Sequence, residues 1–491
     1  MIETREGRSA TRAASRVAGA RRRDARSAAP GLWLERLPVI DGHSAADVAE
    51  RFRDLPGLAL LESGRRGRNS RWSFLSADPL VVLDAPATGN DPFATARAHL
   101  ARLDASRLRT GAPPFAGGLI GYLSYDLGRA FERLPDIAPD DQGLPLLRLG
   151  LHDWVIAWDR RTGDAWLAGR AVDGDGSRLE SRLAAVRERV AATGSVVADA
   201  SDDLAFVSNL SRAEYERGVE AVRAAIERGE IYQANLTRRL EAAFDRDPWP
   251  LYRRLRAGDP AQFGAYLDLG HGPRGAAPRA ILSASPEPFL AVDGRGHVRT
   301  DPIKGTRPRG RAPVEDRALA RELLASAKDR AENVMIVDVL RNDLGRVCQP
   351  GSVRVPRLCR LERTAAVQHL VSTVTGDLRT GCGPFEVLAS SFPGGSITGA
   401  PKIRAMQLLE TLEPVRRGPY TGALGWIGPD GAMATSILIR TLVADGLRLT
   451  LHVGGGITWG SDPAAEWDET VAKAAGPLRA IGGREVEASE A

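Results

Sequence analysis

Two Asp-Gly steps in the C-terminal third of the chain restrict the fold more than any other local feature. Asp430-Gly431 and Asp445-Gly446 separate three segments in which apolar residues alternate, at residues 423–427, 435–443 and 447–453. Asp-Gly favours the tight turns that join antiparallel strands. These segments therefore predict an antiparallel meander.

Helical periodicity surrounds this meander. Ser211 and Glu214 form a capping box, Gly229 stands where the helix would end, and residues 231–240 follow as a strand. Further helices are predicted at residues 177–192, 314–327, 330–341, 401–412 and 464–481, and short strands at 58–61, 72–75 and 154–158. The pattern predicts a mixed α/β chain.

The 491 residues are 43% hydrophobic and can bury a large core. We divide them into an Arg-rich disordered extension (1–30), an N-terminal region (31–200) and a catalytic region (205–485). No apolar run reaches the ~18–20 residues of a membrane span. Three cysteines without a CxxC pair argue against disulfide scaffolding and thiolate zinc sites, so we expect a cytoplasmic protein.

The basic charge of the chain leaves two classes of partner open. The formal net charge is +5, and eight arginines fall within residues 1–30, a segment that could also act as a basic arm or transit peptide. A small dianionic metabolite satisfies such a charge as well as nucleic acid does. After residue 30 the arginines alternate with acids and no nucleic-acid-binding motif is present, so we do not expect nucleic-acid binding.

Lysine is rare in this chain. Of 67 basic residues only Lys304, Lys328, Lys402 and Lys473 are lysine. Arginine solvates a surface equally well but is never neutral in a protein. The four lysines are therefore candidates for positions that need an amine.

Lys304 and three glutamates lie in segments that could carry chemistry. A buried Lys304 with a lowered pKa would be a nucleophile, although a lone lysine more often binds an anion or a carboxylate. Glu466 and Glu469 share one helix face, with Lys473 one turn further, and Glu332 precedes an apolar run. Such carboxylates could hold Mg2+, or they could form a solvated, salt-bridged helix face.

Two glycine-rich segments could bring backbone amides close to an anion, at residues 393–402 and Gly454-Gly455-Gly456. Pro401 suits the first turn of a helix, whose N-terminus favours anions. The glycine triplet could equally be a turn at a strand end. His369 lies among apolar residues, where a histidine is more often part of the core than a catalyst.

Five ordered segments resemble the chorismate-utilising family, which includes anthranilate synthase component I, aminodeoxychorismate synthase component I, and isochorismate and salicylate synthases. They are Ile231-Tyr-Gln-Ala-Asn-Leu-Thr237, Pro302-Ile-Lys-Gly-Thr306, and residues 328–345, 393–402 and 465–473. The resemblance covers about Leu58 to Ile481. It implies the anthranilate synthase component I fold, with two antiparallel sheets packed face to face, helices outside and an active site in the cleft between them.

The resemblance also implies roles for individual residues. Glu332 and Glu469, with Glu466 beside them, would hold Mg2+ on the ring carboxylate of chorismate. His369 would lie near the leaving hydroxyl, and Glu287 would be the acid that protonates it. The residues matched to carboxylate binding are Tyr420, Arg440, Gly454, Gly455, Gly456 and Lys473, and those matched to the ring are Gly305, Thr306 and Ser396.

Two positions discriminate among the members of the family. In the family that this chain resembles, isochorismate and salicylate synthases carry a lysine that acts as the base for water, where this chain has Gln233. The glutamine argues against water as the nucleophile. Anthranilate synthases carry alanine where this chain has Lys304, and the lysine is the mark of the C4-aminating branch. The resemblance therefore implies Lys304 as the nucleophile and 4-amino-4-deoxychorismate as the product, with anthranilate synthesis as the alternative.

Partners follow from the same resemblance. The chain shows no glutaminase cysteine motif, so a separate glutamine amidotransferase subunit is expected to supply ammonia. Ser63, in Leu60-Leu-Glu-Ser63, resembles the start of the family's tryptophan pocket, with residues 69–72 and 262–264 as further walls. The sequence leaves open whether tryptophan binds there.

Overall fold

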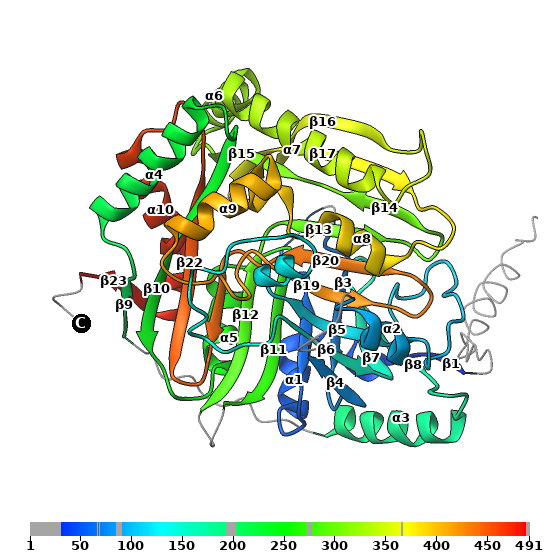
Figure 1. Cartoon of the computed structure of the whole chain (residues 1–491). Coiled ribbons are helices and arrows are strands. Elements are labelled where there is room, and N and C mark those ends of the chain that lie inside the picture. The colour runs from blue at the N-terminus through cyan, green and yellow to red at the C-terminus, as the bar shows by residue number, and fades with distance from the viewer. Residues whose placement is uncertain are drawn as a thin grey trace, which may run out of the picture.

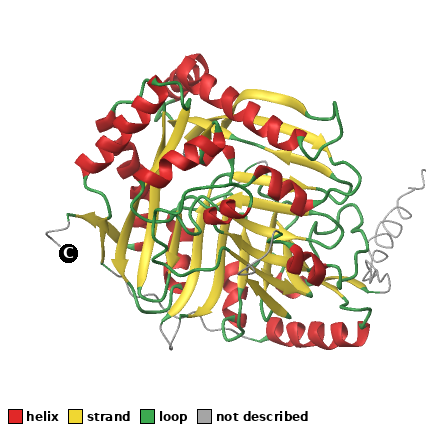
Figure 2. Cartoon of the chain, viewed as in Figure 1, coloured by secondary structure: helices red, strands yellow, loops and turns green. Residues whose placement is uncertain are grey.

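The computed structural model describes residues 31–65, 67, 69–84, 91–192, 203–272, 277–364 and 367–487. The Arg-rich extension at residues 1–30 lies outside the described residues. Two large sheets form the body, and helices run along its outside (Figures 1 and 2). The predicted fold class, with two sheets and outer helices, is confirmed.

The larger sheet has thirteen described strands. In spatial order they are β1 (Leu32–Arg36), β8 (Asp164–Arg170), β7 (Trp154–Asp159), β3 (Trp72–Ser76), β2 (Ala59–Glu62), β11 (Phe263–His271), β12 (Pro278–Ser285), β21 (Thr441–Ala444), β22 (Arg448–Ile457), β10 (Gln233–Ala243), β9 (Leu204–Ser208) and β23 (Gly483–Val486), with β18 (Gly399–Ala400) also paired to β10. Among the described pairings only β9 with β23 is parallel.

The smaller sheet has ten described strands. Their order is β15 (Ile303–Pro308), β17 (Val367–Asp377), β14 (His297–Thr300), β13 (Pro288–Val292), β20 (Met433–Ile437), β19 (Ala423–Ile427), β5 (Gly118–Leu123), β6 (Leu147–His152) and β4 (Val81–Asp84), and β16 (Arg354–Arg363) pairs with β17. Both sheets mix strands from distant parts of the chain.

Ten described helices accompany the sheets. They are α1 (Ala45–Ala49), α2 (Ala94–Leu100), α3 (Gly176–Ala191), α4 (Arg212–Glu227), α5 (Trp249–Gly258), α6 (Pro313–Ala325), α7 (Ala327–Gly345), α8 (Pro384–Ser391), α9 (Lys402–Leu412) and α10 (Pro463–Ile481). Short 3₁₀ segments include η3 (Tyr125–Ala130) and η5 (Gly395–Ile397). No helix in the described ranges is long and apolar enough to cross a membrane.

Alternating side chains explain why the sheets stack. In β19, Leu424 and Trp426 join the core shared by the two sheets, whereas Ala423 and Ile427 join the core beneath α7 and α8. Ile281 of β12 likewise faces the shared core. Successive residues of a strand point to opposite faces, so a strand that is apolar on both faces is buried on both. This produces the order helices, sheet, sheet, helices.

The local sequence signals are accurate where one element carries them. The Ser211–Glu214 capping box begins α4, and Gly229 follows α4 with a φ of +76°. The predicted helices correspond to α3, α6, α7, α9 and α10 with small shifts at their ends. The helix boundaries depend on caps within a few residues, and the sequence displays those caps.

The meander prediction is wrong in one respect. Residues 435–443 do not form one strand, because the chain leaves the smaller sheet after β20 and enters the larger sheet at β21. Arg440, between them, has a φ of +50°. The turns at Asp430-Gly431 and Asp445-Gly446 therefore close two hairpins, one in each sheet.

Candidate active site

Lys304 and Glu332 form the ion pair at the centre of the candidate site. Lys304 lies on β15 and Glu332 on α7, and their Nζ and Oε1 atoms are 2.9 Å apart. Nζ also donates to the Ser396 carbonyl oxygen of η5 at 3.1 Å. Gln233, the first residue of β10, donates from Nε2 to Oε1 of Glu332 at 2.8 Å. Four segments far apart in sequence thus converge on one carboxylate and one amine.

The glycine triplet at the end of β22 lets this cluster pack closely. A Cβ at Gly456 would lie 2.2 Å from Nε2 of Gln233 and 2.9 Å from Oε1 of Glu332, and a Cβ at Gly455 would lie 2.8 Å from Oε2 of Glu466. Such distances are far below van der Waals contact, so a side chain at either glycine would displace Gln233, Glu332 or Glu466. The glycine triplet therefore allows the Gln233, Glu332 and Glu466 side chains to approach the backbone of β22 closely. The sequence alone did not decide between this role and a turn at a strand end.

Helix α10 brings the other predicted acidic residues to the same end of β22. Asp462 caps it by accepting from the backbone N–H of Ala465 at 2.9 Å. Glu466 is buried, whereas Glu469 pairs with Lys473 at 2.7 Å. Lys473 also donates to the Gly454 carbonyl oxygen at 2.8 Å. The i, i+3 and i+7 spacing thus presents two carboxylates and an amine toward the glycine triplet.

The charges of these residues are strongly coupled. Burial alone would lower the pKa of Lys304, but the nearby Glu332 and Glu287 carboxylates outweigh it and raise that pKa. Burial raises the pKa of Glu287, and Lys304 only partly opposes this effect. For Glu332, the Lys304 charge and hydrogen bonds overcome burial and lower the pKa. Both shifts favour a Lys304 ammonium beside a Glu332 carboxylate, while Glu287 keeps its proton to a higher pH than an ordinary glutamate does.

The residues present fit a magnesium ion held by few protein ligands. No group of three or more His, Cys, Asp or Glu side chains in the described ranges is arranged to hold a metal. Mg2+ needs only one or two protein carboxylates and takes water or substrate oxygens otherwise. Oε1 of Gln233, buried beside Glu332, has no hydrogen-bond partner among the described residues and could accept from a metal-bound water. Burial, with Glu469 nearby, raises the pKa of Glu466, whose oxygens a cation would stabilise.

The residues matched to the ring lie on β15 and η5, and His369, matched to the leaving hydroxyl, lies on β17. Oγ1 of Thr306 is 2.9 Å from Nδ1 of His369. Gly305 is the extra residue of a bulge between Lys304 and Thr306, and its φ of +73° favours glycine. Burial, followed by Arg440 and Arg65, lowers the pKa of His369 to about 4, so the ring is neutral.

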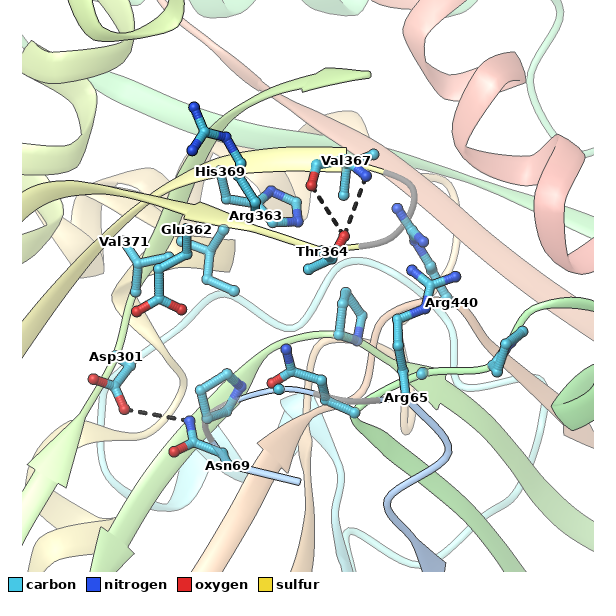
Figure 3. A pocket seen from close by; sticks show the side chains of 17 residues that line it. Arg65, Asn69, Asp301, Glu362, Arg363, Thr364, Val367, His369, Val371 and Arg440 are labelled. Carbon is cyan, nitrogen blue, oxygen red and sulfur yellow. Dashed lines mark hydrogen bonds between the residues drawn. The ribbon is translucent and has the colours of Figure 1, made fainter. Parts of the chain in front are cut away.

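Not every predicted residue joins this cluster through a described contact. Tyr420 is buried, and its ring stacks on His452 with centroids 5.0 Å apart. Arg440 lines a cavity of about 110 Å³ together with His369 (Figure 3). Ser63 lies elsewhere, in a cavity of about 170 Å³ between the sheets with Trp72 and Gln262. The residues matched to carboxylate binding therefore lie in more than one group, with Lys473 beside the glycine triplet and Arg440 beside His369.

Sequence reasoning missed a buried support behind the site. Arg417 donates to the carbonyl oxygens of Ile397 at 3.0 Å and Asn235 at 2.6 Å, and it pairs with Glu413 at 2.7 Å. Glu413 accepts from the Thr237 hydroxyl at 2.8 Å. These contacts join η5, which carries Ser396, to β10, which carries Gln233. Only the i, i+4 spacing of Glu413 and Arg417 was a visible signal.

Two face-to-face sheets carry a cluster of glutamates and lysines at one end of β10 and β22. A sequence profile described as "chorismate binding enzyme" matches residues 59–479, and the chain belongs to that family. It is 40% identical to aminodeoxychorismate synthase component 1 of Salmonella typhimurium, over 87% of this chain and 94% of that protein. It is also 40% identical to anthranilate synthase component 1 of Streptomyces coelicolor, over 87% and 84%.

Solved structures share the fold of this chain. Anthranilate synthase component I of Streptococcus pneumoniae superposes with a TM-score of 0.74 at 28% identity, covering 84% of this chain and 93% of that one. The isochorismate synthase MenF of Escherichia coli, at 18% identity and a TM-score of 0.70, shares the fold over 93% and 96% of the two chains.

Proposed function

We propose that this chain aminates chorismate at C4 and forms 4-amino-4-deoxychorismate. The observation that carries the proposal is the position of Lys304, whose amine lies between Glu332 and the Ser396 carbonyl oxygen. The resemblance gives anthranilate synthases alanine at this position. The 40% identity to an aminodeoxychorismate synthase component 1 supports the proposal.

The residues of the cleft would first orient the substrate. Lys473 and the Gly454–Gly456 backbone offer a cation and a close-packed surface for one carboxylate, and Arg440 offers a guanidinium for the other. Fixing both ends of a dicarboxylate converts a bimolecular attack into an oriented one. Mg2+ at Glu332 and Glu469, with Glu466 beside them, would supply positive charge that polarises the ring carboxylate.

Lys304 and Glu287 would then carry the bond changes. Attack requires the neutral amine, so the Lys304 ammonium must first lose its proton. The C2–N bond forms, the ring double bonds shift and the C4–O bond breaks, while Glu287 gives its proton to the departing hydroxyl. Ammonia next attacks C4, the double bonds shift back, and Lys304 is released. The raised pKa of buried Glu287 supports its role as the acid.

Two ligands complete the proposal. We propose a separate glutamine amidotransferase subunit as the source of ammonia, on the basis of the family resemblance. We propose tryptophan as the occupant of the cavity beside Ser63, which Trp72, Gln262 and other residues line. Calorimetric titration with tryptophan, repeated with Ser63→Tyr to fill the cavity, tests the second assignment.

Product analysis tests the function directly. The chain is mixed with chorismate, ammonium and Mg2+, and the products are separated by chromatography and weighed by mass spectrometry. A 4-amino product supports the proposal. The 40% identity to an anthranilate synthase component 1 makes anthranilate the second candidate, and release of anthranilate would overturn C4 amination.

A further inference from the structure

Two half-buried arginines share one wall of the cavity beside His369. Arg65 comes from the loop after β2, and Arg440 from the crossover between β20 and β21. Figure 3 shows both on the same side of the cavity, opposite Asp301 and Glu362. The two guanidiniums therefore come from the N-terminal and C-terminal parts of the chain.

Neither guanidinium is neutralised by a carboxylate in the part of the chain that the structure describes. Arg71, in the same loop as Arg65, forms an ion pair with Asp159, in which Nη2 and Oδ2 are 2.6 Å apart. No carboxylate of the described residues forms such a pair with Arg65 or Arg440. Half-burying an uncompensated charge is costly, so this arrangement favours an anion in the cavity.

The surroundings agree with a positive field at this wall. Beyond burial, Arg440 and then Arg65 lower the pKa of His369, so both charges act on the same ring. The neutral His369 ring adds no competing charge. The Arg65 backbone N–H donates to the Ala261 carbonyl oxygen at 3.0 Å, which fixes where the loop approaches the cavity.

We propose that Arg65 is a substrate-binding residue, which together with Arg440 binds the carboxylate of the dicarboxylate substrate that lies away from the Glu332 end of the cleft. This assignment rests on the proposed function for the identity of the substrate. Arginine binds carboxylates through two parallel hydrogen bonds, so a pair of guanidiniums on one wall suits one carboxylate. Arg65 thereby gives the N-terminal part of the chain a direct role in the site.

Steady-state kinetics with chorismate, ammonium and Mg2+ test the assignment. Loss of a charged hydrogen bond corresponds to about 10-fold or more in binding. Arg65→Gln should therefore raise KM for chorismate about 10-fold with kcat changed less than about two-fold, and Arg65→Lys should recover part of the loss. Arg102→Gln is the matched control and should leave KM unchanged, because its exposed guanidinium is already paired with Asp173 at 2.6 Å and lies in no site described above.

Two further measurements separate binding from a merely structural role. The NMR titration of His369 should move to higher pH in Arg65→Gln, because a positive charge beside the ring is lost. Inorganic phosphate should compete with chorismate in the wild type and compete less in Arg65→Gln. An unchanged KM in Arg65→Gln, or an equal rise in Arg102→Gln, would overturn the assignment.

The outcome does not depend on which product forms. If the wild type released anthranilate, C4 amination would fail, but the KM comparison would still decide the role of Arg65, since both reactions begin with chorismate. If no turnover occurred, calorimetric binding of chorismate to the same variants would make the comparison.

Discussion

Nζ of Lys304 lies 2.9 Å from Oε1 of Glu332, and the same oxygen accepts from Nε2 of Gln233 at 2.8 Å. The proposed nucleophile and the proposed metal ligand therefore neutralise each other in the described arrangement. Their two roles call for different partners, an electrophilic carbon for Lys304 and a cation for Glu332. Separate variants can test them.

Replacing Lys304 should remove C4 amination. Lys304→Ala leaves no amine to attack C2, and the remaining chemistry should shift to direct attack by ammonia at C2, giving a 2-amino product. Lys304→Arg should also be inactive, because a guanidinium stays protonated. Mass spectrometry of the wild type trapped with chorismate, without ammonia, should find an adduct on the peptide that contains Lys304.

A matched control for this experiment is Lys328→Arg, which keeps the charge of an exposed lysine on α7. It should retain most of the activity. Full C4 amination by Lys304→Ala would contradict the proposed mechanism.

Metal removal should stop turnover. Excess chelator should abolish ammonium-dependent amination, and Glu332→Ala and Glu469→Ala should each reduce kcat/KM by about 10²-fold or more, in the range reported for groups that stabilise developing charge. Added Mg2+ should restore the wild type after chelation. Undiminished activity in excess chelator would rule out the metal assignment.

The isolated chain should use ammonium but not glutamine. A glutaminase nucleophile needs a thiol with a lowered pKa. Burial instead raises the pKa of Cys348 to about 11, Cys359 is buried, and Cys382 is half-buried. Glutamine should therefore give no product until a glutaminase subunit is added. Glutamine-dependent turnover by the pure chain would contradict this expectation.

Acid should destabilise the protein through His152. This ring is buried, its Nδ1 lies 2.8 Å from the Ser76 hydroxyl, and burial lowers its pKa to about 3 from 6.5. The unfolded chain therefore binds a proton that the folded chain does not between pH 6.5 and about 3. The free energy of unfolding should fall with pH in that window by at most about 1.4 kcal/mol per unit from this residue.

Urea unfolding at pH 7 and pH 4.5 measures the contribution of His152 to the pH dependence of the free energy of unfolding. His152→Asn should lower stability at pH 7 but show a shallower decrease toward pH 4.5 than the wild type. His297→Asn, at a half-exposed ring paired with Asp377, should keep the wild-type slope. Equal slopes for the wild type and His152→Asn would refute the assignment.

Breaking the buried Arg417–Glu413 pair should be costly. Arg417→Met leaves Glu413 buried without its cation, and removing one partner of such a pair costs about 3–5 kcal/mol. The double variant Arg417→Met with Glu413→Leu should recover part of that loss, since both charges are gone. Urea unfolding of the wild type, Arg417→Met, Glu413→Leu and the double variant measures the coupling.

Much of the fold was predictable because its signals are local. The capping box lies at the start of α4, and the Asp-Gly turns lie directly between the strands that they join. Each of these signals specifies the local backbone geometry independently of distant parts of the chain. The division of residues 435–443 was not predictable. The alternating pattern of residues 435–443 continues across the point between β20 and β21 where the chain changes sheet. Only the pairing of β20 and β21 with different distant strands decides where that point lies.

The same reasoning applies to the site. Lys304, Glu332 and Glu469 lie in motifs long enough to resemble a family. Arg65 lies in a Gly- and Arg-rich loop without any pattern, and its approach to Arg440 depends on how two distant segments pack. Arg417 bonds to backbone carbonyls, which every residue carries, so no side-chain pattern identifies Ile397 or Asn235 as its partners.

The exchange of strands between early and late parts of the chain has a consequence for dissecting the protein. β2 pairs with β11 and β5 pairs with β19. Each sheet therefore contains strands that precede the connection between α3 and β9 and strands that follow it. Two fragments cut at that connection would each expose half-built sheet edges. Neither would be an autonomous folding unit, and activity would return only when both are present during refolding, by complementation.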